Sequence, residues 1–282
     1  MTRSHLAALL SLILATLALA GPSQAQGCPP GQPCEIAEGE YRFELPRNGG
    51  GAMPVIVHFH GAANSAAAVL RTRSIVDPAL DRGYAFIALQ GLVQPGRNFT
   101  NWSVRDGRRP MRDEAAFARA AVAHLGQYVP LDPERVYLTG FSRGASAIWD
   151  IACHDPAGFA GFSTVAGAFW DPLPEACAEP VRLSHYHGWE DATVPLEGRH
   201  FGRGDLIGQG DVYAGLRILR ETAGLQTHLA QTTSRIGDML CKSWADGDLS
   251  FCLHPGGHRP PDGWMAHAID GFEGVPEDRA QR

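Results

Sequence analysis

The sequence predicts an α/β fold in which a mostly parallel central sheet is covered by helices on both faces. Short apolar runs rich in β-branched and aromatic residues, such as 55–60 and 84–89, have the length of buried strands. Stretches with apolar residues at helical spacing, such as 113–128, alternate with these runs along the chain. This alternation is typical of parallel sheets, because their crossover helices pack on both faces.

Each further element follows from a local pattern. Polar and apolar residues alternate over 41–45, which predicts an edge strand, and Asp113 and Glu114 mark the start of the helix 113–128. We expect further strands at 136–139, 162–166 and 181–187, and further helices at 145–152 and 211–222. The turn signal Asp246-Gly247 predicts a hairpin of strands 239–245 and 249–254, and 265–272 is expected to form a short closing helix.

The N-terminal segment has the features of a secretory signal peptide. Arg3 supplies a positive charge, residues 6–20 are apolar, and Ser23-Gln24-Ala25 is a cleavage site of small residues. We expect a signal peptide over 1–25, a single domain over 26–282, and a secreted protein, extracellular or periplasmic, without membrane contact after cleavage. Cleavage after Ala20 and retention as a membrane anchor are the alternatives, although the apolar run is short for a spanning helix.

Charge and cysteine content narrow the class of protein further. A net charge of −6 over 282 residues is mild, which argues against strong binding to nucleic acid. The six cysteines all follow the expected signal peptide and suit an oxidising compartment.

Local sequence predicts how these cysteines pair. Cys28 and Cys34 flank a proline-rich turn. With a two-residue turn at Asp246-Gly247, Cys241 and Cys252 face each other across the hairpin at a Cα spacing of about 5.5 Å, which suits a disulfide. A three-residue turn would shift this register. Cys153 and Cys177 are left to pair with each other; free thiols or metal ligands are the alternative.

The motif Gly140-Phe141-Ser142-Arg143-Gly144 follows the expected strand 136–139 and precedes a helix. A serine at such a sharp strand-to-helix turn is lifted off the sheet, and the helix N-terminus behind it favours developing negative charge. Ser142 is therefore a candidate nucleophile.

A serine nucleophile needs an acid, a base and oxyanion donors. Asp191 comes just after the expected strand 181–187 and is the candidate acid, with Glu190 as its rival. His258 follows Gly256-Gly257 and is the candidate base, with His254 and His267 as rivals. The Arg143 N–H and the Ala62 N–H are the expected oxyanion donors, and Ala63 is the alternative to Ala62.

These motifs together resemble a known family. His60-Gly61, Asn101-Trp102, Gly140 to Gly144, His187-Gly188-x-x-Asp191-x-x-Val194-Pro195 and Gly256-Gly257-His258 occur in this order. The chain is similar to the secreted poly(3-hydroxybutyrate) depolymerase and feruloyl esterase-like family of α/β-hydrolases. The resemblance implies an α/β-hydrolase fold and cofactor-independent hydrolysis of an ester substrate, which is a polyester, a polysaccharide-linked ester or a small aryl ester. Ser142, His258 and Asp191 would form the triad.

Two departures from the family concern the substrate. Arg143-Gly144-Ala145 follows the serine where many relatives have Asn-Gly or Ala-Gly-Gly, and Arg259-Pro260-Pro261 follows the base. A peptidase or amidase on the same triad, and a non-catalytic binding protein on the same scaffold, are the alternative functions.

Aromatic and histidine residues near the expected loops have two interpretations each. Trp102, Trp170 and Trp189 could line a substrate cleft, as could Trp264, or they could pack in the core. The pairs His58/His60 and His185/His187 alternate on strands, which puts each pair on one face in a spacing that metal ligands use. Further ligands are missing beside His60, so loop support and core packing are expected and a metal site is not.

Overall fold

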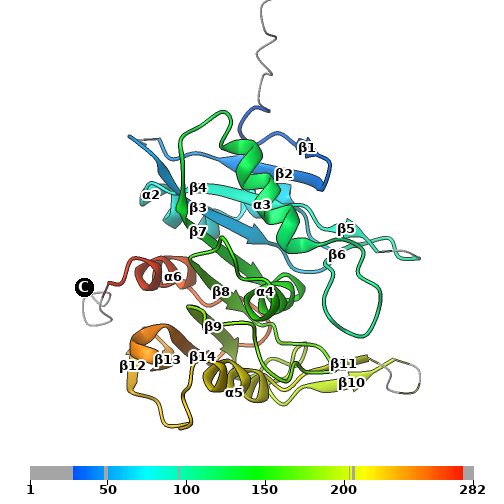
Figure 1. The fold of residues 1–282 in the computed structure, drawn as a ribbon, viewed down its shortest axis with the longest axis vertical. Helices are drawn as coiled ribbons and strands as arrows, with labels where there is room; N and C mark the ends of the chain where they lie inside the picture. The colour runs from blue at the N-terminus through cyan, green and yellow to red at the C-terminus, as the bar shows by residue number, and fades with distance from the viewer. Residues whose placement is uncertain (1–27, 48–49, 95, 203, 205–206, 276–282) are drawn as a thin grey trace, which may run out of the picture.

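One long sheet runs through the computed structural model, which describes residues 28–47, 50–94, 96–202, 204 and 207–275 (Figure 1). The sheet has ten strands among these residues, in the order β1-β2-β4-β3-β7-β8-β9-β14-β13-β12. In chain order the strands are β1 (Cys34–Ile36), β2 (Gly39–Glu44), β3 (Met53–Phe59), β4 (Ala85–Leu89), β7 (Leu131–Phe141), β8 (Gly161–Val165), β9 (Leu183–Gly188), β12 (Thr232–Ile236), β13 (Met239–Trp244) and β14 (Leu249–His254).

The centre of the sheet, from β4 through β3, β7, β8 and β9 to β14, is parallel. The strands at either end are antiparallel. Every residue of β3, β4 and β8 is buried, as expected for strands covered on both faces. The expected mostly parallel α/β sheet is therefore confirmed.

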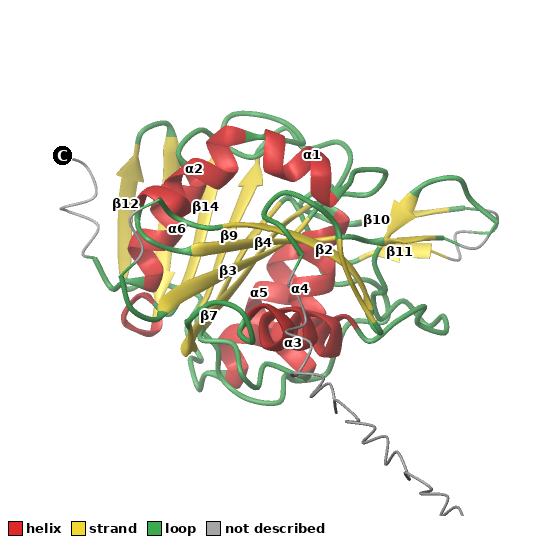
Figure 2. Cartoon of the chain, turned by 90° about the horizontal axis from the view of Figure 1, so that it is seen from above, coloured by secondary structure: helices red, strands yellow, loops and turns green. Residues whose placement is uncertain are grey.

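Helices cover both faces of this sheet (Figure 2). On one face lie α1 (Ala66–Arg71), α2 (Arg73–Asp81) and α6 (Trp264–Phe272); on the other lie α3 (Glu114–Leu125), α4 (Arg143–His154) and α5 (Val212–Thr222). The alternation of β3 divides the core accordingly: Ile56 packs in the cluster that holds Val76 and Ile269, whereas Val57 packs in the cluster that holds Ile148.

Aspartates begin two of these helices. The Asp113 carboxylate accepts a hydrogen bond from the Ala116 N–H at 2.9 Å before α3, and the Asp211 carboxylate accepts one from the Ala214 N–H at 2.9 Å before α5. Each bond satisfies an N–H that has no partner inside its helix.

The structure corrects several expected element positions. The edge strand at the β2 end of the sheet is β1, and β2, expected as an edge, is hydrogen-bonded on both sides. The strand expected at 136–139 begins at Leu131. The sequence patterns did not predict α1, α2 and β12, nor the small pairs β5 (Leu92–Val93) with β6 (Thr100–Asn101) and β10 (Arg199–Phe201) with β11 (Ile207–Gln209). Most of these elements are only two to six residues long, which is too short for periodicity to identify them, and α2 contains Pro78, which normally argues against a helix.

The three expected disulfides, Cys28–Cys34, Cys153–Cys177 and Cys241–Cys252, are all present. Cys241 faces Cys252 in the register, although the loop between the last paired residues, Trp244 and Leu249, is longer than the expected two residues.

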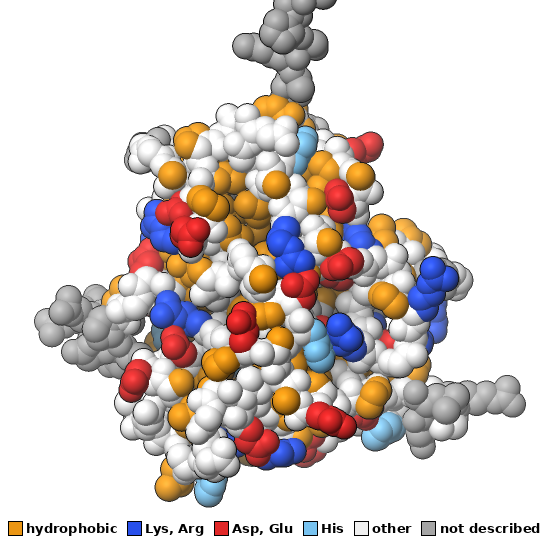
Figure 3. Space-filling view, in the orientation of Figure 1, with side chains coloured by type: hydrophobic (Ala, Val, Ile, Leu, Met, Phe, Trp, Pro, Cys, Tyr) orange, Lys and Arg blue, Asp and Glu red, His pale blue; other side chains and the backbone are white. Residues whose placement is uncertain are grey.

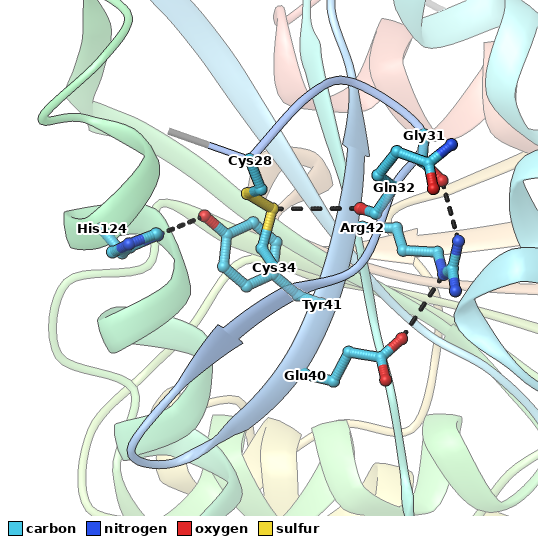
Figure 4. The surroundings of a disulfide bond; sticks show 8 residues. All are labelled: Cys28, Gly31, Gln32, Cys34, Glu40, Tyr41, Arg42 and His124. Carbon is cyan, nitrogen blue, oxygen red and sulfur yellow. Dashed lines mark hydrogen bonds and ion pairs between the residues drawn. A yellow bond between two sulfur atoms is a disulfide. The ribbon is translucent and has the colours of Figure 1, made fainter. Parts of the chain in front are cut away.

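The Cys28–Cys34 bond anchors the start of the described chain (Figure 4). Beside it, the Tyr41 hydroxyl lies 2.7 Å from His124 Nδ1 of α3, and the Arg42 guanidinium donates to the Gly31 carbonyl at 2.9 Å. These contacts tie β2 to a helix and to the loop that the disulfide closes.

The expected signal peptide, residues 1–25, lies outside the described residues. Among the residues that the structure describes, no helix is long and apolar enough to cross a membrane. On the face drawn in Figure 3, basic and acidic side chains are interspersed, in keeping with the mild net charge of −6.

Candidate active site

Ser142 lies between the end of β7 and the first turn of α4, at the carboxyl edge of the parallel strands. Its backbone has φ 56° and ψ −122°, a conformation that a non-glycine residue rarely adopts. The Ser142 N–H donates to the Val165 carbonyl of β8 at 2.8 Å, which holds the turn against the neighbouring strand. The local fold thus presents the serine on the strained strand-to-helix turn that its motif predicted.

Asp191 and His258 come from the loops after two adjacent strands, β9 and β14. The two strands are paired to their carboxyl ends, where His254 lies opposite Gly188. Beyond that pair, the Trp189 N–H donates to the His254 carbonyl at 2.8 Å and the Glu190 N–H donates to the Gly256 carbonyl at 3.1 Å. The loops that carry the predicted acid and base are therefore bonded to each other through their backbones.

The three predicted residues form a continuous hydrogen-bond chain. His258 Nε2 lies 2.9 Å from Ser142 Oγ, and His258 Nδ1 lies 2.8 Å from Asp191 Oδ2. With a proton on Nδ1, the imidazole donates to the carboxylate and its Nε2 can accept the serine proton. The Asp191 side chain is completely buried, and that of His258 is 20% exposed. The arrangement can therefore activate a serine beside solvent while its carboxylate is shielded.

The Asp191 carboxylate is held in its ionised form. Burial by itself raises the pKa of this carboxyl, but the hydrogen bonds from His258 and from the Val194 N–H outweigh burial and hold the pKa below its usual range. The second carboxylate oxygen, Oδ1, accepts from the Thr193 N–H at 2.9 Å and from the Val194 N–H at 2.8 Å. This leaves Oδ2 directed at the imidazole.

The rival residues lie elsewhere. Glu190 is exposed. The His254 ring is buried, and its Nδ1 accepts from the Gly256 N–H at 3.1 Å. His267 Nδ1 lies 2.6 Å from the Tyr186 hydroxyl.

The loop after β3 lies against the serine. A side chain at Gly61 would approach Ser142 Cβ to 3.4 Å. Among the described residues, neither the Ala62 N–H nor the Arg143 N–H donates to a backbone carbonyl in a turn, loop or cap. The alternative donor, Ala63, is occupied, because its N–H donates to the Thr100 carbonyl at 2.9 Å. Ala62 and Arg143 thus keep free donors in the segments that flank Ser142.

His60 supports this loop, as was expected from the sequence. Its Nδ1 lies 2.7 Å from the Gly61 carbonyl, and its Nε2 accepts from the Gly91 N–H at 3.0 Å. Burial lowers the pKa of His60 to about 4, so the ring is neutral near pH 7. Its place directly before a glycine at the end of a strand was the available signal.

The positively charged Arg143 side chain is held by contacts with other protein groups. Its guanidinium lies 4.2 Å from the centre of the Trp170 ring and 3.3 Å from an Asp106 carboxylate oxygen, and its Nε donates to the Trp102 carbonyl at 3.3 Å. The contacts with Trp102 and Asp106 tie α4 to the loop before α3.

The four tryptophans that could line a cleft differ in their exposure to solvent. Trp102 has no exposed surface, and its indole N–H donates to the His60 carbonyl at 2.6 Å. It supports the loop from beneath, and the expectation that it contacts substrate is wrong in this structure. Trp170 is 9% exposed under Arg143, and Trp189 is 66% exposed beside the acid loop. Trp264 is buried and donates to Ser163 Oγ at 3.0 Å.

The two His-x-His pairs are buried and hydrogen-bonded within the protein. His58 Nδ1 lies 3.0 Å from Thr139 Oγ1, and His185 Nε2 lies 2.9 Å from His187 Nδ1. In the described part of the chain, no group of three or more His, Cys, Asp or Glu side chains is placed to hold a metal ion.

The chain is similar to one curated protein over part of its length and to solved structures over most of it. No family model matches the chain. The protein named "Putative esterase NocK" from Nocardia uniformis subsp. tsuyamanensis is 29% identical over 150 residues, which make up 51% of this chain and 42% of that protein. The chain thus matches less than half the length of this relative.

Solved structures match a larger share of the chain than this relative does. Acetyl xylan esterase from Aspergillus awamori has a TM-score of 0.62 at 15% identity, over 83% of this chain and 93% of that one. Esterase PE8 has a TM-score of 0.54 at 17% identity, over 82% and 97%. The Bacillus cereus carboxylesterase has a TM-score of 0.51 at 14% identity, over 83% and 94%. The chain has the α/β-hydrolase fold.

Proposed function

We propose that this protein is a serine hydrolase that cleaves carboxylic esters through a triad of Ser142, His258 and Asp191. The observation that carries the proposal is the continuous chain of two hydrogen bonds, 2.9 Å and 2.8 Å, that joins the strained serine to a buried, ionised aspartate through one imidazole. The esterase names of the NocK relative and of the solved structures with the same fold support the choice of esters.

The chemistry follows from the proton positions. Ser142 Oγ attacks the ester carbonyl while its proton passes to His258 Nε2, and the Asp191 carboxylate stabilises the imidazolium that forms. The N–H groups of Arg143 and Ala62 donate to the oxyanion. His258 then protonates the leaving alcohol, which breaks the C–O bond and leaves an acyl-enzyme. The same imidazole next takes a proton from water, whose oxygen attacks the acyl carbonyl. His258 then returns this proton to Ser142 Oγ as the acyl C–O bond breaks, which releases the carboxylic acid and restores the serine.

The resemblance of the sequence motifs narrows the proposed substrates. Poly(3-hydroxybutyrate)-like polyesters, feruloylated polysaccharides and small aryl esters are the classes to screen, with the acetylated xylan of the A. awamori enzyme's name beside them. Secretion, and with it action on an extracellular or periplasmic ester, is part of the same proposal.

Replacement of the nucleophile tests the function directly. In Ser142→Ala, turnover of p-nitrophenyl acyl esters should fall by a factor on the order of 10⁴ to 10⁶, because no other group can form the acyl-enzyme. Ser74→Ala, at an exposed position of α2, is the matched control and should keep wild-type turnover. Near-wild-type hydrolysis by Ser142→Ala would refute the proposal.

Two further measurements separate the alternatives. A fluorophosphonate probe should label Ser142 in the wild type; absence of the adduct would favour a binding protein on this scaffold. A panel of matched esters and peptide amides should show turnover of the esters. Preference for the amides would instead identify a peptidase or amidase.

A further inference from the structure

Two histidines of β9 lie directly behind the acid and belong to no step described above. His185 and His187 are two residues apart on one strand, so their side chains share a face of the sheet, and neither has any exposed surface. Burial lowers the pKa of both rings, and that of His185 well below its usual value, so both are neutral near pH 7.

A continuous line of polar contacts runs from the core through these rings to the acid loop. The Trp149 indole N–H donates to Thr164 Oγ1 at 3.2 Å, and Thr164 Oγ1 lies 2.9 Å from His185 Nδ1. His185 Nε2 lies 2.9 Å from His187 Nδ1, and His187 Nε2 lies 2.8 Å from the Val194 carbonyl.

The two ends of this line set its direction. An indole can only donate and a carbonyl can only accept, so His187 must carry its proton on Nε2. Because His187 is neutral, its Nδ1 accepts, and His185 Nε2 must be the donor. His185 Nδ1 then accepts from the Thr164 hydroxyl, whose oxygen accepts from Trp149. The Trp149 indole N–H also lies 3.4 Å from His185 Nδ1. Because an indole only donates, this contact also requires that His185 Nδ1 is an acceptor.

The line ends on the segment that shapes the acid. The Val194 residue whose carbonyl accepts from His187 donates its own N–H to Asp191 Oδ1 at 2.8 Å. His187 Nε2 also lies 3.4 Å from Asp191 Oδ2, the oxygen that faces His258. One N–H on His187 therefore faces both the loop that holds the carboxylate and the carboxylate itself.

From this geometry we propose that His187 is a positioning residue for Asp191, and that His185 fixes the tautomer in which His187 does so. The inference rests on the proposed function, because its consequence is the orientation of the acid toward His258. Loss of the N–H should slow acyl transfer and leave substrate binding unchanged.

Two variants of His187 separate the N–H from the ring. His187→Leu fills the site without a donor, whereas the side-chain amide of His187→Gln can return an N–H near the position of Nε2. In His187→Leu, kcat should fall by roughly 10- to 100-fold, because the buried Val194 carbonyl in the segment that holds Asp191 loses its donor, with KM within about twofold of the wild type. His187→Gln should keep kcat within about threefold.

His58→Leu is the matched control for core damage. His58 is also a buried neutral histidine that contacts a threonine of the adjacent strand, but it has no contact with the triad. This variant should lower Tm in the same way as His187→Leu and keep kcat. If a folded His187→Leu keeps wild-type kcat, or if Gln is as damaging as Leu, the positioning role is wrong.

The tautomers can be measured without any substrate. Nitrogen-15 NMR of histidine-labelled wild-type and Ser142→Ala protein should show His185 and His187 neutral with the proton on Nε2. A proton on His187 Nδ1, or an imidazolium there near pH 7, would overturn the inference even if every variant failed to fold. Absence of Ser142-dependent ester turnover would instead overturn the proposed function, while the NMR result would still decide the hydrogen-bond line.

Discussion

Gly144 occupies the point where α4 comes closest to the end of β3. A Cβ at this position would lie 2.3 Å from the Phe59 carbonyl oxygen and 2.6 Å from that of His60. Both neighbours are backbone atoms of a buried strand end, so they cannot move aside as a flexible side chain could. The second glycine of the Gly-x-Ser-x-Gly motif is therefore required by helix-to-strand packing beside Ser142.

This contact predicts opposite outcomes for two identical substitutions. Gly144→Ala should destabilise the protein by several kcal/mol, or abolish folding, because overpacking against backbone forces α4 and its serine to shift. Gly271→Ala, in α6, has open space around the new methyl group and should be neutral or stabilise by about 0.5–1 kcal/mol through helix propensity. Chemical denaturation of both variants measures the difference; equal stabilities would contradict the packing argument.

At the scale of elements, the hairpin of β13 and β14 connects the sheet to the loop that carries His258, the proposed base. Cys241 and Cys252 face each other across it, and β14 ends at His254, shortly before His258. The disulfide thus keeps the register of the strand from which the base loop leaves.

Loss of this bond should affect stability and turnover together. Removing both cysteines, which are 11 residues apart, should cost about 3 kcal/mol from loop entropy and lower ester turnover several-fold. Removing Cys153 and Cys177, 24 residues apart at the far end of α4, should cost a similar free energy without that loss of turnover. Tm and kcat at 25 °C of both double variants test this. Equal turnover in the two would show that the hairpin bond does not brace the base.

At the scale of the whole molecule, two buried carboxylates, Asp191 and Asp150, give the free energy of unfolding opposite dependences on pH. The lowered pKa of Asp191 contributes stability above the pKa of the unfolded chain, and that stability is lost as the pH falls through the folded value. Burial raises the pKa of Asp150, on α4, to about 6, although its carboxylate accepts the Arg105 N–H at 2.6 Å. Between about pH 4 and 6 the folded state therefore holds a proton at Asp150 that the unfolded chain has released, so stability falls as pH rises.

Asp150→Asn isolates this contribution. The amide resembles the protonated acid and keeps an oxygen for Arg105, so the variant should gain up to about 3 kcal/mol over the wild type at pH 8 and little at pH 4. Asp238→Asn, at an exposed turn, is the control and should show no such pH-dependent gain. Melting curves from pH 4 to 8 decide; a gain that does not depend on pH would show that Asp150 does not carry this effect.

The sequence by itself determined the parts of this protein that depend on neighbours in the chain. Apolar runs predicted the buried strands, Asp113 and Asp211 marked helix starts, and Gly140 to Gly144 identified the turn around Ser142. The hairpin register paired Cys241 with Cys252, because alternation and turn position are local properties. Chain order also identified Asp191 as the candidate acid and His258 as the candidate base, since parallel strands bring their carboxyl ends to one edge of the sheet.

Only the tertiary structure decided what depends on contacts between distant segments. It buried Trp102 beneath the His60 loop, covered Trp170 with Arg143, and occupied the Ala63 N–H with the Thr100 carbonyl. His185 and His187 have a spacing that metal ligands use, but the structure places them in a line of hydrogen bonds that ends at the loop of Asp191. Periodicity gives the face on which a side chain lies, but which donor or acceptor meets it there is set by strands and helices packed from elsewhere in the chain.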